Sequence, residues 1–212
     1  MTVKISRLYD DYASADAAAL RLEAAGVSRN DISILASNAD GWYDAKRSKP
    51  NGAVDPEHDK DRDGHDDRAE GAGAGAGIGA VAGGAIGALT GLGLLAIPGV
   101  GPVVAAGWLA ATVAGAVSGG AAGGIVGALV ESGVSKENAE LYAETLRRGG
   151  ALVTARVADS DRAKYEAVLA TAAVDVDARA AHYRAAGWKG YTPNAVSYDP
   201  EQVRQERARY RL

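Results

Sequence analysis

The sequence predicts an α+β protein with a ferredoxin-like core, in the element order β-α-β-β-α-β. A glycine-zipper α-helical hairpin is expected as an insertion between the second and third strands. Two observations lead to this prediction. Apolar residues follow strand and helix periodicities at both ends of the chain. Between those ends, residues 71–130 contain no Asp, Glu, Lys, Arg or His and hold 19 of the 28 glycines.

Residues 1–37 are expected to form the first half of the core. Val3 and Ile5 alternate with polar residues, as in a half-buried strand. The stretch from Asp16 to Ala25 has helical spacing, and Ile32 and Ile34 alternate again. This segment therefore predicts one β-α-β unit.

Residues 132–186 are expected to supply a helix and the second half of the core. Four elements are predicted from capping residues and periodicity: a helix over 135–146, a strand over 152–157, a helix over 160–170, and a last short strand at Val174 and Val176. Residues 187–212 form a C-terminal arm. Packing on a neighbouring subunit and a frayed end are both open for this arm.

Residues 71–131, which contain the uncharged block of residues 71–130, are expected to form a hairpin of two helices, Gly75 to Ile97 and Pro102 to Val130. Small residues spaced by four lie along one side of a helix, where two backbones can approach closely. Glycine in a helix costs about 1 kcal/mol, so a regular series favours close packing that compensates. The glycines expected at this contact are Gly71, Gly75, Gly79, Gly83, Gly87, Gly91, Gly107, Gly115, Gly119, Gly123 and Gly127, with Ala111 in the second series.

The hairpin tip is expected at Pro98, Gly99, Gly101 and Pro102, with Trp108 just after it. Each arm exceeds the roughly 20 apolar residues that span a bilayer. Two interpretations follow. The hairpin inserts in the cytoplasmic membrane with both flanking lobes facing the cytoplasm, since no signal peptide is seen; or hairpins from several subunits bury one another in a soluble cytoplasmic assembly.

Composition narrows the function. A net charge of −4 gives no global basic field, so nucleic acid is not an expected partner. No cysteine is present, which excludes disulfides and thiol nucleophiles. No phosphate-binding loop, dinucleotide fingerprint or nucleophile elbow occurs, so the sequence predicts a protein that is not an enzyme.

Residues 38–70 read as an acidic linker that contains a calcium-loop pattern. The pattern D-x-D-x-D-G-x5-E supplies oxygen ligands at the spacing that calcium prefers. Its candidate ligands are Asp59, Asp61, Asp63, His65 through its carbonyl, Asp67 and Glu70. A solvated acidic linker is the competing interpretation, because no second loop pairs with this one. Calcium is the only cofactor suggested.

The stretch from Gly91 to Trp108, with the N-terminal β-α-β unit and the later run from Tyr142 to Val153, resembles bacterial general stress proteins of the heat-induced or low-temperature-induced, glycine-zipper type. The resemblance covers about residues 1–190. It implies a stress-associated protein, often membrane-associated, with no established catalysis.

These observations predict a non-enzymatic stress protein that self-associates through its glycine-zipper hairpin, in a membrane or in an oligomeric core. Its partners are then copies of itself and, in the first case, the lipid bilayer. The alternative is a calcium-responsive assembly module that uses residues 59–70 and exists as a large soluble homo-oligomer.

The calcium hypothesis predicts a Tm that rises with added calcium, because an ion that binds only the folded chain stabilises it. Replacing Asp59 and Asp63 with Asn should remove the rise, as measured by thermal unfolding with calcium or with magnesium. If added calcium does not change the Tm of the unmodified protein, the calcium hypothesis is wrong.

Overall fold

The computed structural model describes residues 1–44, 93–118, 124–193 and 195–210. These residues form a mixed α/β structure with a five-stranded antiparallel sheet and seven α-helices. The elements, in chain order, are β1 (Thr2–Tyr9), α1 (Tyr12–Ala24), the 3-10 helix η1 (Arg29–Asp31), β2 (Ile32–Ser37), β3 (Gly93–Ile97), β4 (Gly101–Ala106), α3 (Trp108–Ser118), α4 (Gly124–Glu131), α5 (Lys136–Arg147), β5 (Ala151–Ala158), the 3-10 helix η2 (Asp159–Asp161), α6 (Arg162–Ala170), α7 (Val176–Ala185) and α8 (Pro200–Ala208).

The strand order is β1-β5-β2-β4-β3, and every neighbouring pair is antiparallel. Strand β5 lies between β1 and β2, so these two strands run parallel to each other and α1 crosses from one to the other. The two predicted β-α-β units thus interlock through β5. The predictions of β1, α1, β2, α5, β5 and α6 are confirmed, with ends that differ by a few residues.

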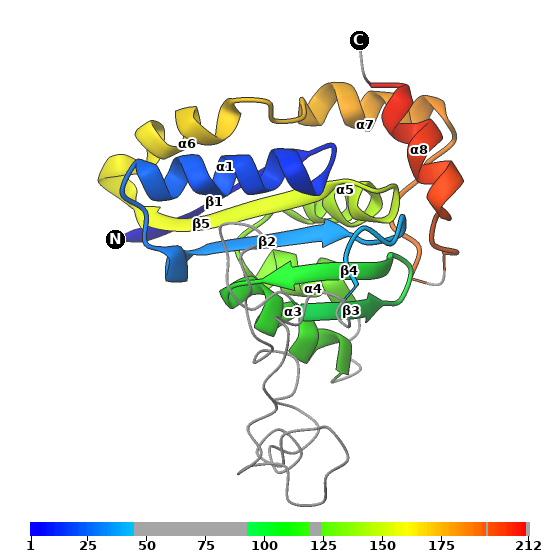
Figure 1. The fold of residues 1–212 in the computed structure, drawn as a ribbon, viewed down its shortest axis with the longest axis horizontal. Helices are drawn as coiled ribbons and strands as arrows, with labels where there is room; N and C mark the ends of the chain where they lie inside the picture. Colours follow the sequence, from blue (N-terminus) through cyan, green and yellow to red (C-terminus); the bar gives the residue numbers. More distant parts are fainter. Residues whose placement is uncertain (45–92, 119–123, 194, 211–212) are drawn as a thin grey trace, which may run out of the picture.

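Each face of the sheet packs against its own helices, because side chains alternate along every strand. Ile5, Ile34 and Val153 pack against α1 and α6 on one face. Leu8, Leu35 and Leu152 pack against α3, α4 and α5 on the other. Figure 1 shows α1 and α6 side by side above the strands, with α7 and α8 at the end of the molecule opposite the N-terminus.

Tyr9 connects the sheet to α6. Its hydroxyl donates a hydrogen bond to the Leu169 carbonyl at 2.6 Å, and the side chain is fully buried. Burial raises the pKa of Tyr9 to about 12, so the phenol is neutral at physiological pH and remains a donor.

The predicted last strand at Val174 and Val176 is wrong. Val174 donates one backbone hydrogen bond to Leu8 of β1, at 2.8 Å, beside the outer edge of the sheet. The chain then turns at once into α7, because the Asp175 carboxylate accepts from the Ala178 amide and caps that helix. The capping aspartate therefore ends the extended segment after a single bond.

The helical hairpin is wrong over residues 93–106. Its predicted first arm ends in strand β3 and its second arm begins with strand β4, and β4 pairs with β2. Alternation explains the difference: Leu95, Ile97 and Val103 all bury on one face of the sheet. Helices α3 and α4 occupy part of the predicted second arm.

The C-terminal arm folds onto its own chain, which the sequence did not predict. Asp199 caps α8 in a capping box with Gln202, and Pro200 occupies the first helical position. Val203 of α8 is fully buried against Gly149. The described part of the arm is therefore an ordered part of the fold.

A mutation of Gly149 can test how closely α8 packs against the core. Its φ is +103°, and a Cβ there would overlap Cγ1 of Val203. Gly149→Ala should lower the free energy of unfolding by about 1–3 kcal/mol more than Gly133→Ala, measured by urea unfolding. Gly133 is the matched control, because its φ is +99° with no atom within 4 Å of an added Cβ. Equal losses in the two variants would show that α8 does not press on Gly149.

Candidate functional site

The predicted calcium ligands, Asp59 to Glu70, lie outside the described residues. Among the residues described, no group of three or more His, Asp or Glu side chains is placed to hold a metal ion. None of the helices within the described ranges has the length and apolar character needed to cross a membrane.

Some of the glycines predicted at the helix–helix contact also lie outside the described residues, and the others can be located. Gly71 to Gly91, Gly119 and Gly123 lie outside the described residues. Gly107 lies between β4 and α3 with a φ of +83°, outside any helix. Gly115 of α3 and Gly127 of α4 are exposed, and a Cβ added at Gly115 would meet no atom within 4 Å. The structure therefore does not place Gly115 at a close contact between two helices of this chain.

The predicted hairpin tip is the turn between β3 and β4. Val100 donates to the Ile97 carbonyl, and Pro98 followed by Gly99 with a φ of +75° is the pattern of a type II turn. The C-terminal arm covers this turn. The Tyr191 hydroxyl donates to the Pro98 carbonyl at 2.8 Å, and the backbone of Thr192 and Pro193 lies directly against Gly99.

The arm also lies against the start of β4. A Cβ added at Gly101 would overlap Ser197 of the arm. Pro102 continues β4, and its carbonyl accepts from the Asn38 amide. The four tip residues therefore belong to a covered β-turn and strand start.

Trp108 lies at the other end of β4 from this turn, at the start of α3. Two cations face its ring: the Lys4 ammonium at 5.3 Å and the Arg156 guanidinium at 4.9 Å from the centroid. Its Nε1 is buried and has no hydrogen-bond partner among the described residues. Trp108 thus joins α3 to β1 and β5 through cation–π contacts.

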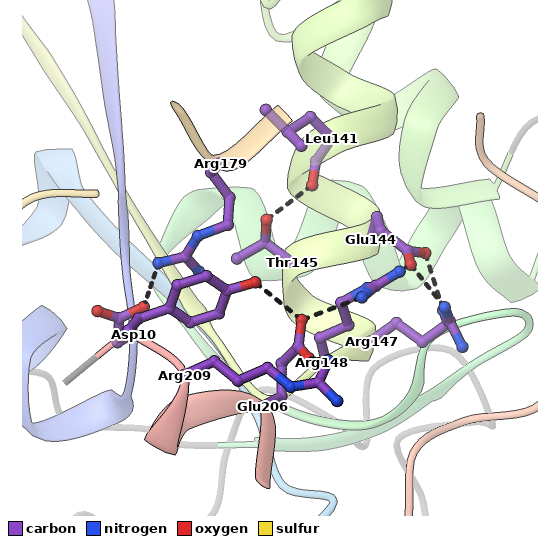
Figure 2. A network of polar contacts seen from close by, with 10 residues as sticks. Asp10, Leu141, Glu144, Thr145, Arg147, Arg148, Arg179, Glu206 and Arg209 are labelled. Carbon is purple, nitrogen blue, oxygen red and sulfur yellow. Dashed lines mark hydrogen bonds and ion pairs between the residues drawn. The ribbon is translucent and has the colours of Figure 1, made fainter. Parts of the chain in front are cut away.

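A network of buried charges fastens α8 to the core (Figure 2). Its centre is Arg148, 7% exposed, which donates to Glu144 of α5 at 2.6 Å and to Glu206 of α8 at 3.0 Å. Arg147 pairs with the same Glu144, and Arg209 and the Tyr210 hydroxyl bind Glu206. Figure 2 shows the two glutamates on either side of the Arg148 guanidinium.

Two further arginines extend this network to the ends of the strands. Arg179 of α7 binds Asp10 at 2.6 Å. Arg207 of α8 donates to Asp40 and to the carbonyls of Asp10 and Gly149, at 2.6, 3.2 and 2.6 Å. Helix α8 is therefore bound to residues that follow β1, follow β2 and precede β5.

Tyrosine rings separate the arginines of the network. The Arg148 guanidinium lies 4.1 Å from the Tyr183 centroid, and Arg179 lies 3.6 Å from Tyr210. Burial opposes the charged form of Arg148, but the hydrogen bonds and charges of Glu144 and Glu206 outweigh it and raise its pKa. Burial also raises the pKa of Tyr183 and Tyr210, so both phenols stay neutral.

This arrangement is suited to holding α8 and leaves little room for a ligand. The cavity among Arg148, Arg179, Glu206 and Tyr210 measures about 10 Å³, the space of a single water molecule. A larger hollow of about 280 Å³ lies between α5 and α7, lined by Glu137, Glu140, Arg184 and Lys189 beside Trp188. Its charges belong to mostly exposed side chains of both signs.

The exposed residues of β3, α3 and α4 carry no charge, and we refer to them together as the uncharged edge. Leu94 is 47% and Val130 42% exposed. No charged residue occurs between Gly93 and Val130. Helix α3 contacts both α4 and β3, so these elements are neighbours. The members of the uncharged edge are Leu94, Ala96, Ala111, Gly115, Gly127 and Val130.

Sequence reasoning identified the uncharged block but not the buried network. The arginines and glutamates of the arm carry no pattern that distinguishes them from a solvated tail. A signal was present only at Asp199-Pro200 with Gln202, a helix start that predicts α8.

Comparison of the chain with protein-family models, curated proteins and solved structures finds no match.

The network predicts a large effect from one isosteric change. Glu206→Gln removes a buried negative charge and leaves Arg148 with Glu144 alone, so it should lower the free energy of unfolding by roughly 2–4 kcal/mol. It should also speed tryptic cleavage within α8. Urea unfolding and limited trypsin digestion measure both effects.

The control is Glu201→Gln, in the same helix. Glu201 pairs with Arg204 on the surface, where both side chains are more than half exposed, so its loss should leave the free energy of unfolding almost unchanged. Similar effects of the two variants would contradict the role assigned to Glu206.

Proposed function

We propose that this protein is a non-enzymatic assembly protein that self-associates through its uncharged block. One observation carries the proposal: the described part of the block exposes an uncharged edge on a chain whose other segments are rich in charge. All 50 Asp, Glu, Lys and Arg residues lie outside residues 71–130. The stress association implied by the resemblance belongs to the same proposal.

The chemistry of the uncharged edge suits contact with another copy of the chain. Interface centres are depleted in charged residues, and exposed apolar patches on soluble proteins mark interaction sites. Ala111, Gly115 and Gly127 have small side chains or none, which lets a partner backbone come close. A charged ligand or a nucleic acid would find no counter-charge on this edge.

The buried polar groups support a structural rather than a catalytic use of the core. Arg148, Arg179, Glu144 and Glu206 bind one another and Asp10 inside the described fold, so their charges are already paired. Enzymes instead place perturbed titratable groups where a substrate can reach them.

The core itself fits the proposal as a modified ferredoxin-like domain. Strand β5 between β1 and β2, with α1 and α6 on one face, supports this assignment. The β3–β4 hairpin extends the sheet beyond β2, while Val174 supplies one bond at the position expected for the fourth strand. On this proposal the core is a scaffold that presents the uncharged block.

Self-association should appear as a particle mass that is a multiple of the 21.5 kDa chain. Because the contact is uncharged, the particle mass should not decrease when the salt concentration is raised. The mass is measured by light scattering on the soluble fraction of cells that are broken without detergent. A particle mass of one chain at all protein concentrations would contradict the proposal. Recovery of the protein only in the membrane fraction, even after an alkaline wash, would make the bilayer the partner instead.

Ala111→Glu should reduce the mass, because it puts a charge on the uncharged edge at an exposed helical position. Ala181→Glu is the matched control, since Ala181 is an exposed alanine of helix α7. Equal particle masses for the two variants would show that α3 does not take part in the contact between copies.

A further inference from the structure

The sheet has two outer strands, β1 and β3, and within the described residues only β1 is protected. Natural proteins guard exposed strand edges with charged residues, prolines or covering segments. Strand β1 carries Lys4 and Arg7, and Val174 binds the Leu8 carbonyl on its outer side. Strand β3 has the sequence Gly-Leu-Leu-Ala-Ile, with no charge and no proline.

The register identifies which backbone groups of β3 face outward. The Asn38 amide donates to the Pro102 carbonyl at 2.8 Å, so Pro102 points its backbone toward β2. Backbone groups alternate in direction along a strand, so Val103 points toward β3, where it pairs with Leu95. The N–H and C=O groups of Leu94 and Ala96 therefore face away from β4. No described strand lies on that side of β3.

We propose that β3 pairs with β3 of a second copy of this chain, antiparallel and about a two-fold axis at Leu95. This inference rests on the proposed self-association and names its surface. Leu94 of one copy lies opposite Ala96 of the other, and both pairs exchange N–H···O=C bonds. Four hydrogen bonds then join two five-stranded sheets into one.

The second copy is the occupant because the edge is complementary to itself. The outward groups of Leu94 and Ala96 are equidistant from Leu95, so a two-fold axis satisfies all of them at once. Strand β3 itself contains no charged residue that would repel the other copy or favour a charged peptide. Leu94 is nearly half exposed and gains cover from Ala96 of the other copy. A two-fold contact closes on itself, so it predicts dimers as the unit of assembly.

Ala96→Pro is the most direct test. It removes an N–H that faces outward and so leaves the β3–β4 bonds intact, and proline is tolerated on an edge strand with that geometry. The dimer dissociation constant should rise at least about tenfold, measured by light scattering over a concentration series. In the unmodified dimer, the Leu94 and Ala96 amides should exchange hydrogen more slowly than in diluted monomer.

Leu94→Lys gives a second variant in case the proline disturbs the hairpin, and circular dichroism checks both folds. It should also dissociate the dimer, because it adds the guard charge that β3 lacks. Leu20→Lys is its matched control, since Leu20 is 48% exposed against 47% for Leu94 and lies on α1. Leu20→Lys should keep the mass of the unmodified protein.

Two results would overturn the pairing, and they separate it from the broader proposal. If Ala96→Pro and Leu94→Lys both keep the unmodified mass while Ala111→Glu lowers it, β3 pairing is wrong and self-association through the uncharged block stands. If the unmodified protein is a monomer throughout, both proposals fail.

Discussion

The double pairing of β5 is the constraint from which the rest of the structure follows. This strand comes from residues 151–158 and pairs along its length with β1, and through Ala151–Ala155 with β2. Hydrogen bonds on both sides and helices on both faces bury six of its eight residues, and Leu152 and Val153 are fully buried. Because β5 takes the inner edge of β2, only the outer edge of β2 is left for β4. Strand β3 then becomes the end of the sheet.

The C-terminal arm completes this arrangement by connecting segments that are distant in the chain. Tyr191 holds the β3–β4 turn, and Val203 packs on Gly149 just before β5. Arg207 binds groups that follow β1 and β2. A single segment of about twenty residues thus contacts the hairpin and three strand ends. Stability at this end of the sheet depends on buried ion pairs, which are costly to break because each lost partner leaves a buried charge.

The buried network and the uncharged edge differ in the polar groups that they contain. The buried network binds its arginines and glutamates to one another, so its charges act within the chain and position α8. The uncharged edge has no charged side chains that could act in that way, and the outer side of β3 offers instead the backbone amides and carbonyls of Leu94 and Ala96. Such atoms recognise another strand rather than a charged ligand. The internal contacts of α8 and the proposed association surface therefore use different groups of the chain.

The sequence alone determined the elements whose patterns are local. Alternation at Val3 and Ile5, the cap at Ser135 and the helical run to Ala170 were enough to locate most of the two β-α-β units, and the lack of charge in residues 71–130 identified the segment proposed for association. Only the tertiary structure decided the rest. Residues 93–106 contain none of the glycines spaced by four, and they form a β-hairpin because Leu95, Ile97 and Val103 can bury beside β2, a choice that depends on a free sheet edge. The position of α8 depended on Glu206 meeting Arg148, two residues whose contact no sequence spacing reveals.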